Sequence, residues 1–148
     1  MEPEEAERFL KAAAEGPYHA LFFIALRSGI REREILALRW QDIDFRKNLI
    51  HVSRRWYHNK FDLPKGNRTR YVDMSQQLKA VLQFETVREE VELLFPGPNG
   101  QPIGASSFTK NWFKPTLKKA GLSGFTIHDL RHTFGSLLLV LCPINKWQ

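Results

Sequence analysis

The spacing of apolar residues changes twice along the chain, and this change is the strongest constraint on its fold. Helical spacing comes first, a group of short β-branched and aromatic runs separated by turn residues follows, and helical spacing then returns. The expected helices are 3–15, 18–27, 32–39, 75–94, 106–120 and 126–141, and the expected strands are 49–52, 55–61 and 70–74. We therefore predict a mostly helical α+β fold with a small antiparallel sheet at one edge.

The length and composition of the chain predict a single domain that spans residues 1–148. The chain has 148 residues, of which 43% are hydrophobic, so it can bury a substantial core. Its longest apolar runs are too short to cross a bilayer, and its acidic N-terminus does not resemble a secretion signal. A single cysteine, Cys142, excludes an internal disulfide and a multi-cysteine zinc site. We expect a soluble, cytoplasmic protein without membrane contact.

The positive charge is concentrated in two segments of the chain. The 22 Lys and Arg exceed the 16 Asp and Glu by six. Residues 27–79 have a net charge of +7 and residues 105–148 have +5, whereas residues 1–26 and 80–104 each have −3. Such a division predicts one side of the molecule that faces a polyanion. A solvated arginine-rich surface without a ligand would give the same net charges. Charge alone therefore does not decide between such a surface and a polyanion-binding side.

The sequence HDLRH places His128, Arg131 and His132 on one face of a helix, because residues three and four apart are neighbours there. Thr126 and Asp129 are spaced as a capping box that would begin this helix. A zinc site is disfavoured, since Asp is shorter than the Glu of an HExxH motif and Arg131 would put a fixed positive charge beside the metal. We predict an anion site and no metal; local capping and salt bridging is the alternative.

The sequence SGIREREILALRW contains a second candidate cluster. Gly29 permits a tight turn that would present Arg31 at the start of a helix, and the apolar residues that follow would anchor that helix. A guanidinium group held there is a planar fork suited to two phosphate oxygens. Glu34 is placed to hold a neighbouring basic side chain. By itself, this sequence also fits an ordinary amphipathic helix.

The sequence PKGNRTRYV contains a third candidate cluster. Lys65 is expected at the tip of a hairpin, followed by Arg68 and Arg70. A lysine in such a loop can act as a point charge on a phosphate or as a general acid. By itself, this sequence also fits a solvated turn.

The order of the three clusters resembles the catalytic domain of the tyrosine recombinases, the phage integrase family. The segments SGIREREILALRW, DIDF, PKGNRTR and GLSGFTIHDLRHTF follow one another as in that family, and the resemblance covers about residues 3–141. It implies cleavage and rejoining of double-stranded DNA through a 3′-phosphotyrosyl intermediate, without a metal or nucleotide cofactor. It also implies a prokaryotic, phage or mobile-element origin.

The resemblance implies a role for individual residues when it is carried over position by position. The catalytic residues that it implies are Arg31, Lys65, His128 and Arg131, and the supporting residues are Glu34 and His132. Arg68 and Arg70 are expected to contact the DNA. In such a site the guanidinium groups stabilise the negative charge of a pentacoordinate phosphorane, and the lysine protonates the leaving oxygen.

The sequence departs from the family pattern at its expected nucleophile. That tyrosine lies C-terminal to the second arginine in the family, whereas here 17 residues follow Arg131 and all three tyrosines, Tyr18, Tyr57 and Tyr71, precede it. A preceding helical domain that helps such enzymes clamp DNA is also absent from these residues. We expect a truncated catalytic domain, either a fragment or the product of a degenerate gene.

The function expected from these residues is that of a recombinase catalytic-domain fragment that binds DNA phosphate but does not cleave by itself. The alternative is a non-catalytic DNA-binding or interaction module, which would pair with an intact recombinase. The apolar residues 137–141, together with Ile144 and Trp147, would lack covering residues in such a fragment. We therefore also expect self-association through this end.

Overall fold

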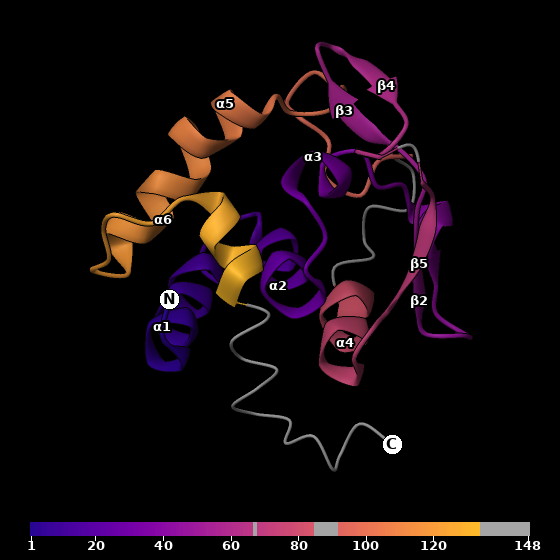
Figure 1. Ribbon diagram of the computed structural model, residues 1–148. Helices are drawn as coiled ribbons and strands as arrows, with labels where there is room; N and C mark the ends of the chain where they lie inside the picture. The colour runs from indigo at the N-terminus through magenta and orange to yellow at the C-terminus, as the bar shows by residue number, and fades with distance from the viewer. Residues whose placement is uncertain (67, 85–91, 134–148) are drawn as a thin grey trace.

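The computed structural model describes residues 1–66, 68–84 and 92–133, which form helices around a core and two small antiparallel sheets (Figure 1). The helical segments are α1 (Pro3–Ala13), α2 (His19–Ser28), α3 (Glu32–Ile35), η1 (Trp40–Asp42), α4 (Gln76–Phe84), α5 (Ala105–Phe108), η3 (Thr109–Phe113) and α6 (Lys114–Lys119). Residues 127–133 are also helical. The strands are β1 (Ile43–Asp44), β2 (Leu49–Val52), β3 (Arg55–Tyr57), β4 (Lys60–Asp62) and β5 (Arg70–Asp73). The predicted α+β fold is confirmed.

The first two helices begin and end where their local sequence dictates. The Glu5 carboxylate accepts a hydrogen bond from the backbone N–H of Glu2 at 2.8 Å, which satisfies a donor at the start of α1. Glu4 and Glu5 lie in the first turn of α1, where the positive end of the helix dipole stabilises acidic groups. Helix α2 ends at Gly29, whose φ of 70° lies in the left-handed region that glycine adopts without steric cost. The chain therefore turns sharply before it enters α3.

An aromatic cluster joins the N-terminal helices to the later helical segments. The ring centroids of Phe9 and Phe22 lie 4.9 Å apart, and Phe22 also contacts Phe108 and Phe113 at 5.5 and 6.1 Å. All four rings are buried. Leu130, in the helical residues 127–133, is fully buried in the same core. This packing fixes the positions of α2 and of residues 127–133 relative to each other, which matters for the site described below.

The strands form two sheets instead of the single meander that the sequence predicted. One sheet has the order β1-β2-β5, with Ile50 of β2 opposite Ile43 of β1 and Val72 of β5. The other consists of β3 and β4 alone, with Trp56 opposite Phe61. The predicted strand 55–61 is therefore wrong, because the chain reverses within it and pairs with itself.

The reversal between β3 and β4 uses a two-residue turn with positive φ. His58 and Asn59 have φ values of 50° and 60°, and Tyr57 pairs directly with Lys60 across the turn. Turns of this kind favour Asn-Gly, because glycine has no Cβ to clash in the left-handed region. The present sequence is therefore a suboptimal version of this turn.

We expect Asn59→Gly to raise the free energy of unfolding by about 0.5 kcal/mol, because it relieves the left-handed residue of the turn. Thermal or urea denaturation measures this difference. Asn59→Val should change stability in the opposite direction, since a β-branched side chain is strongly disfavoured at positive φ. Equal stabilities of the two variants would contradict this account of the turn.

Two predicted helices are shorter than the sequence indicated. Helix α3 ends at Ile35 rather than Arg39, and α4 is helical to Phe84, while residues 92–94, predicted as its last turn, are not helical. Instead, Arg39 forms an isolated antiparallel bridge with Leu93. The backbone N–H of Leu94 donates to the Leu38 carbonyl at 2.9 Å. This pairing satisfies backbone groups that a longer helix would have used, and it buries Leu38, Leu93 and Leu94 in the core.

The remaining predicted helices are confirmed where the structure describes them. The predicted helix 106–120 corresponds to α5, a single π-helical turn (η3) and α6, which follow one another without a break. The run PGPNGQP at residues 96–102 favours a turn, and the structure has one, closed by the N–H of Gly97, which donates to the Gln101 carbonyl at 2.7 Å. The last predicted helix begins at residue 127, whereas its later part and the expected apolar patch lie outside the described residues. Within the described part of the chain, every helix is too short or too polar to cross a membrane.

Candidate functional site

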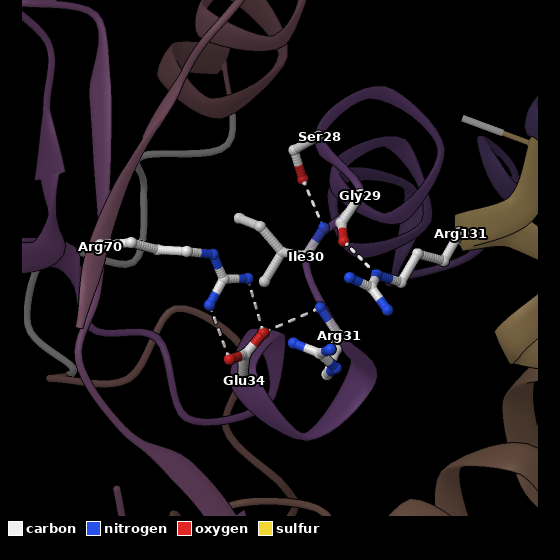
Figure 2. Close-up of polar contacts among 7 residues, drawn as sticks. All are labelled: Ser28, Gly29, Ile30, Arg31, Glu34, Arg70 and Arg131. Atoms are coloured by element: carbon white, nitrogen blue, oxygen red, sulfur yellow. Dashed lines mark hydrogen bonds and ion pairs between the residues drawn. The ribbon is translucent and has the colours of Figure 1, made fainter. Parts of the chain in front are cut away.

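The turn between α2 and α3 is held by short-range hydrogen bonds. The Ser28 hydroxyl accepts from the backbone N–H of Ile30 at 3.3 Å, and the Glu34 carboxylate accepts from the backbone N–H of Arg31 at 3.0 Å. The latter bond caps the start of α3 and leaves the Arg31 side chain projecting from the turn (Figure 2). As predicted, Arg31 therefore lies at the entrance to a helix, directly after the left-handed Gly29.

Glu34 also binds Arg70 of β5 through two hydrogen bonds. Both guanidinium–carboxylate distances are 2.9 Å, and Figure 2 shows the two planar groups facing each other. The Glu34 side chain is only 1% exposed, whereas that of Arg70 is 34% exposed. Burial alone would raise the pKa of Glu34, but the hydrogen bonds from Arg70 and from the Arg31 backbone hold it below its usual value. Glu34 is thus an ionised, buried carboxylate that links α3 to the sheet.

Arg131 reaches the same turn from the other side. Its Nε donates to the Gly29 carbonyl at 2.7 Å, which joins residues that are 102 positions apart in the sequence (Figure 2). Burial lowers the pKa of Arg131, and the positive charges of Arg31 and Arg70 lower it further. Arg131 therefore lies within electrostatic range of two other guanidinium groups. Glu34 offsets part of this charge through its pair with Arg70, and the remaining positive charge of Arg31 and Arg131 favours a bound anion.

The capping box predicted for the last helix is present. The backbone N–H of Thr126 donates to the Asp129 carboxylate at 2.7 Å, and the backbone N–H of Asp129 donates to the Thr126 hydroxyl at 3.3 Å. The helix that begins there places the rings of His128 and His132 next to each other, with centroids 4.6 Å apart. The capping box of Thr126 and Asp129 therefore forms at the start of this helix. It orients the helix face that carries His128, His132 and Arg131.

The four predicted catalytic residues line one cavity of about 260 Å³ between α2, α3, β3 and residues 127–133. The lining residues are Ala25, Ile30, Arg31, Glu32, Arg33, Glu34, Arg55, Lys65, Ile127, His128 and Arg131. The structure thus brings together the three sequence clusters, which are separated by more than twenty residues each. Their catalytic roles remain predictions.

The predicted supporting and DNA-binding residues lie around this cavity in different ways. Arg70 and His132 line a second, more open hollow, which shares Arg131 and His128 with the first. Arg68 is exposed and lines neither hollow. Glu34 thus accepts hydrogen bonds from the Arg31 backbone and from both terminal nitrogens of the Arg70 guanidinium.

The position of Lys65 differs from the sequence prediction. Lys65 does not lie at the tip of a hairpin, because the strands on either side of it belong to different sheets: β4 pairs with β3, and β5 pairs with β2. It lies in the exposed connection between these sheets and still lines the cavity. The hairpin prediction was wrong because the sequence shows where strands form but not which of them pair.

Sequence reasoning missed three charged residues of the cavity: Glu32, Arg33 and Arg55. Arg55 lies in β3, where Asp62 of β4 accepts a hydrogen bond from it at 3.3 Å, and the packing of α3 on β3 brings it to the cavity. The sequence carries no local signal for this contact, because Arg55 and α3 are distant in the chain. Among the described residues, no three His, Cys, Asp or Glu side chains gather as metal ligands.

The fold and the cavity together define an α+β domain with convergent arginines, a lysine and a histidine, as the resemblance to tyrosine recombinases implied. The chain matches the model of the phage integrase family over residues 1–140 and belongs to that family.

Curated relatives include recombinases from bacteria and phage. The chain is 28% identical to the integrase of Salmonella phage P22, in an alignment that covers 100% of this chain and 40% of the phage protein. It is 29% identical to a tyrosine recombinase XerC-like protein of Caldanaerobacter subterraneus, with 91% of this chain and 42% of that protein covered. The chain thus spans about two-fifths of the length of these relatives.

Solved structures of recombinases have the same fold. The integrase of transposon Tn1549, in complex with a circular intermediate DNA, superimposes with a TM-score of 0.81 at 22% identity, over 96% of this chain and 53% of the other. The XerA recombinase superimposes with a TM-score of 0.80 at 24% identity, over 96% of this chain and 50% of the other. At these identities the likeness establishes the fold.

Proposed function

We propose that these residues form the phosphate-binding part of a site-specific tyrosine recombinase, and that the cavity receives a phosphate of duplex DNA. The observation that carries this proposal is the convergence of Arg31, Lys65, His128 and Arg131 on one cavity, from three separate parts of the chain. The Tn1549 integrase, which shares the fold, was solved in complex with DNA. The basic segments 27–79 and 105–148 supply all four side chains.

In this proposal, the two arginines bind the phosphate and stabilise it as it becomes pentacoordinate. A guanidinium group presents paired N–H donors to phosphate oxygens, and its positive charge is most effective where water is excluded. Arg131 is held by the Gly29 carbonyl, and Arg31 projects from the turn that contains this carbonyl, so the two groups are positioned by a shared backbone segment. Such preorganisation lowers the cost of ordering the arginines when the phosphate binds.

Lys65 and His128 are proposed as proton donors in this cavity. The Lys65 ammonium can give a proton to the oxygen that leaves phosphorus, and the His128 ring can donate a hydrogen bond to a non-bridging oxygen or assist the attacking group. Glu34 acts indirectly, because it fixes the backbone of Arg31 and the guanidinium of Arg70. His132 is proposed to support His128 through their ring contact.

We expect Arg131→Ala to weaken binding of a labelled DNA duplex about 10–100-fold at low salt, because it removes charge-assisted hydrogen bonds to phosphate. Affinity should fall steeply with salt in the parent protein, and the slope should decrease by about one in the variant. Fluorescence anisotropy at several salt concentrations measures both quantities.

Lys11→Ala is the matched control for this experiment, since Lys11 is exposed on α1 and lines no part of the cavity. It removes the same charge and should change affinity less than 3-fold, as expected for a distant surface charge. Equal losses for Arg131→Ala and Lys11→Ala would refute the proposed cavity and leave only a diffuse basic surface.

The placement of Tyr18 and Tyr71 away from the cavity favours a second candidate function, a DNA-binding module in which neither of these residues acts as a nucleophile. Tyr18 is buried in the core against Phe108 and Trp112, and Tyr71 stacks on His51 on the outer side of the sheet. Tyr57 lies against arginine side chains of the cavity, and the chain has no tyrosine after Tyr71. Such a module would bind DNA through the same cavity and contribute no attacking oxygen.

A further inference from the structure

The cavity contains one carboxyl group that the proposed function does not use, that of Glu32. Glu32 is the first residue of α3 and lines the cavity beside Arg31. Its Oε2 atom is buried and has no hydrogen-bond partner among the described residues. Glu34, by comparison, has both carboxylate oxygens bonded to Arg70. A buried, unpartnered carboxyl oxygen beside an anion site requires an explanation, since it costs free energy unless a ligand or a proton satisfies it.

The groups that face the Glu32 carboxyl come from every element around the cavity. Helix α2 presents only the apolar Ala25 there, so no charge from that helix compensates Glu32. The titratable and charged groups among the lining residues are Arg31, Arg33 and Glu34 of α3, Arg55 of β3, Lys65 of the β4–β5 connection, and His128 and Arg131 of residues 127–133.

Compared with a glutamate in water, these surroundings favour the protonated form of the Glu32 carboxyl. Burial raises the pKa of Glu32 to about 7, and the nearby charge of Arg33 opposes this rise without cancelling it. Near neutral pH the carboxyl therefore exists in both forms. The protonated form has an O–H donor, whereas the ionised form is an acceptor that places a negative charge in the cavity.

We propose that Glu32 makes phosphate binding in this cavity dependent on a proton: the protonated carboxyl donates a hydrogen bond to a phosphate oxygen, and the ionised carboxyl repels the phosphate. The inference rests on the proposed function, because it assumes that the cavity receives a phosphate. It adds Glu32 to the residues that determine phosphate affinity. Above neutral pH the ionised Glu32 lowers this affinity, whereas the arginines raise it. The proton comes from solvent, and no covalent bond to phosphorus is involved.

The test compares DNA affinity between pH 6 and pH 8 in the parent protein and in Glu32→Gln. A phosphodiester does not titrate in this range, so the DNA keeps its charge. The protonated fraction of a carboxyl with a pKa of about 7 falls about 10-fold over the range, and the parent affinity should fall by up to the same factor. Glu32→Gln keeps a donor and carries no charge, so it should remove this part of the pH dependence and bind more tightly than the parent at pH 8.

Any other group that changes charge in this range is present in both proteins, so its effect cancels in the ratio of parent to variant affinity. Glu7→Gln is the matched control, because Glu7 is exposed on α1 and its loss changes the net charge equally. It should keep the pH dependence of the parent. A Glu32→Gln variant that retains that dependence would overturn the inference.

Failure of the inference and failure of the proposed function give different results. If Arg131→Ala binds DNA as tightly as Lys11→Ala at pH 6, the cavity does not receive a phosphate and the proposed function fails. If Arg131→Ala weakens binding but Glu32→Gln leaves the pH dependence unchanged, only the role of Glu32 fails.

A second measurement needs no variant. The carbon-13 signal of the Glu32 carboxyl reports its titration directly, and thermodynamic linkage requires that a ligand favouring the protonated form raises its pKa. Saturating DNA should move the midpoint of this titration to higher pH. A midpoint that stays in place or moves to lower pH would overturn the inference.

Discussion

Replacement of Arg70 by alanine is expected to lower the free energy of unfolding by about 2–3 kcal/mol, less than the effect of breaking a fully buried ion pair, because the Arg70 side chain is 34% exposed. The variant leaves the Glu34 carboxylate 1% exposed without the two hydrogen bonds that now satisfy it. The backbone N–H of Arg31 remains as a partner of Glu34, but it carries no full charge. The buried negative charge, rather than the loss of arginine packing, is the main cause of the expected effect.

The pH dependence of stability identifies this cause. In the parent protein the pKa of Glu34 lies below its usual value, so the pair contributes its full stability above the unfolded-state pKa and loses it as the pH falls through the folded-state pKa. In Arg70→Ala, burial acts with little opposition and should raise that pKa. The variant should therefore lose stability as the pH rises above the unfolded-state value, which is the opposite sign.

Urea denaturation at pH 3, pH 5 and pH 8 tests both statements, because the parent should lose the stability of the pair below the unfolded-state pKa of 4.5 and the variant should lose stability above it. Arg68→Ala is the matched control, since Arg68 lies in the same segment and is exposed. Its free energy of unfolding should stay within about 0.5 kcal/mol of the parent, as for most exposed substitutions. The double variant with Glu34→Gln should recover part of the stability lost in Arg70→Ala, because it removes the buried charge. An Arg70→Ala protein as stable as Arg68→Ala would show that the pair does not hold α3 to the sheet.

Local sequence signals were sufficient for the parts of the fold that depend on neighbouring residues. The end of α2 at Gly29 and the capping box of Thr126 and Asp129 both follow from side chains and backbone preferences within a few positions. The same holds for the turn at residues 96–102. These features persist in the folded chain because tertiary packing does not compete with them.

Apart from the hairpin within residues 55–61, which reverses locally at a turn without glycine, the errors concern contacts between distant residues. The predicted strand 55–61 is a hairpin, and β5 pairs with β2 rather than with its neighbour β4. The predicted end of the helix 75–94 failed because Leu93 forms a bridge with Arg39. Apolar spacing describes which residues are buried, but not which backbone groups pair with one another, and that choice is made by the whole core.

In the candidate site, too, the sequence predicted the residues that belong to local motifs but not the contacts between distant residues. Arg31, Lys65, His128 and Arg131 were identified from the order of short motifs, and the structure places all four around one cavity. The pairing of Arg70 with Glu34 was not predictable, because the two residues are 36 positions apart and each is surrounded by other charges. Glu32 carries no motif at all, and only its burial in the cavity distinguishes it from the exposed glutamates of the chain.

The 148-residue polypeptide is expected to form no covalent adduct with a DNA substrate that traps the cleaved intermediate. A cavity of arginines, lysine and histidine stabilises a transition state, but cleavage by this route also needs an oxygen nucleophile in line with the leaving group. Tyr18 is buried in the core, and the ring of Tyr71 stacks on His51 at a centroid distance of 4.6 Å. Neither residue lines the cavity.

Tyr57 provides the sharpest test of this expectation, because its ring contacts two side chains of the cavity. The guanidinium carbons of Arg55 and Arg33 lie 4.2 and 5.3 Å from the ring centroid, so the ring is held at the cavity by cation–π contacts. A denaturing gel with end-labelled DNA detects an adduct as a shifted band. Such a band, if it disappeared in Tyr57→Phe and persisted in Tyr71→Phe, would contradict the expectation and identify Tyr57 as a nucleophile. The absence of a band in the parent and in both variants would agree with the expectation that none of the three tyrosines attacks the DNA.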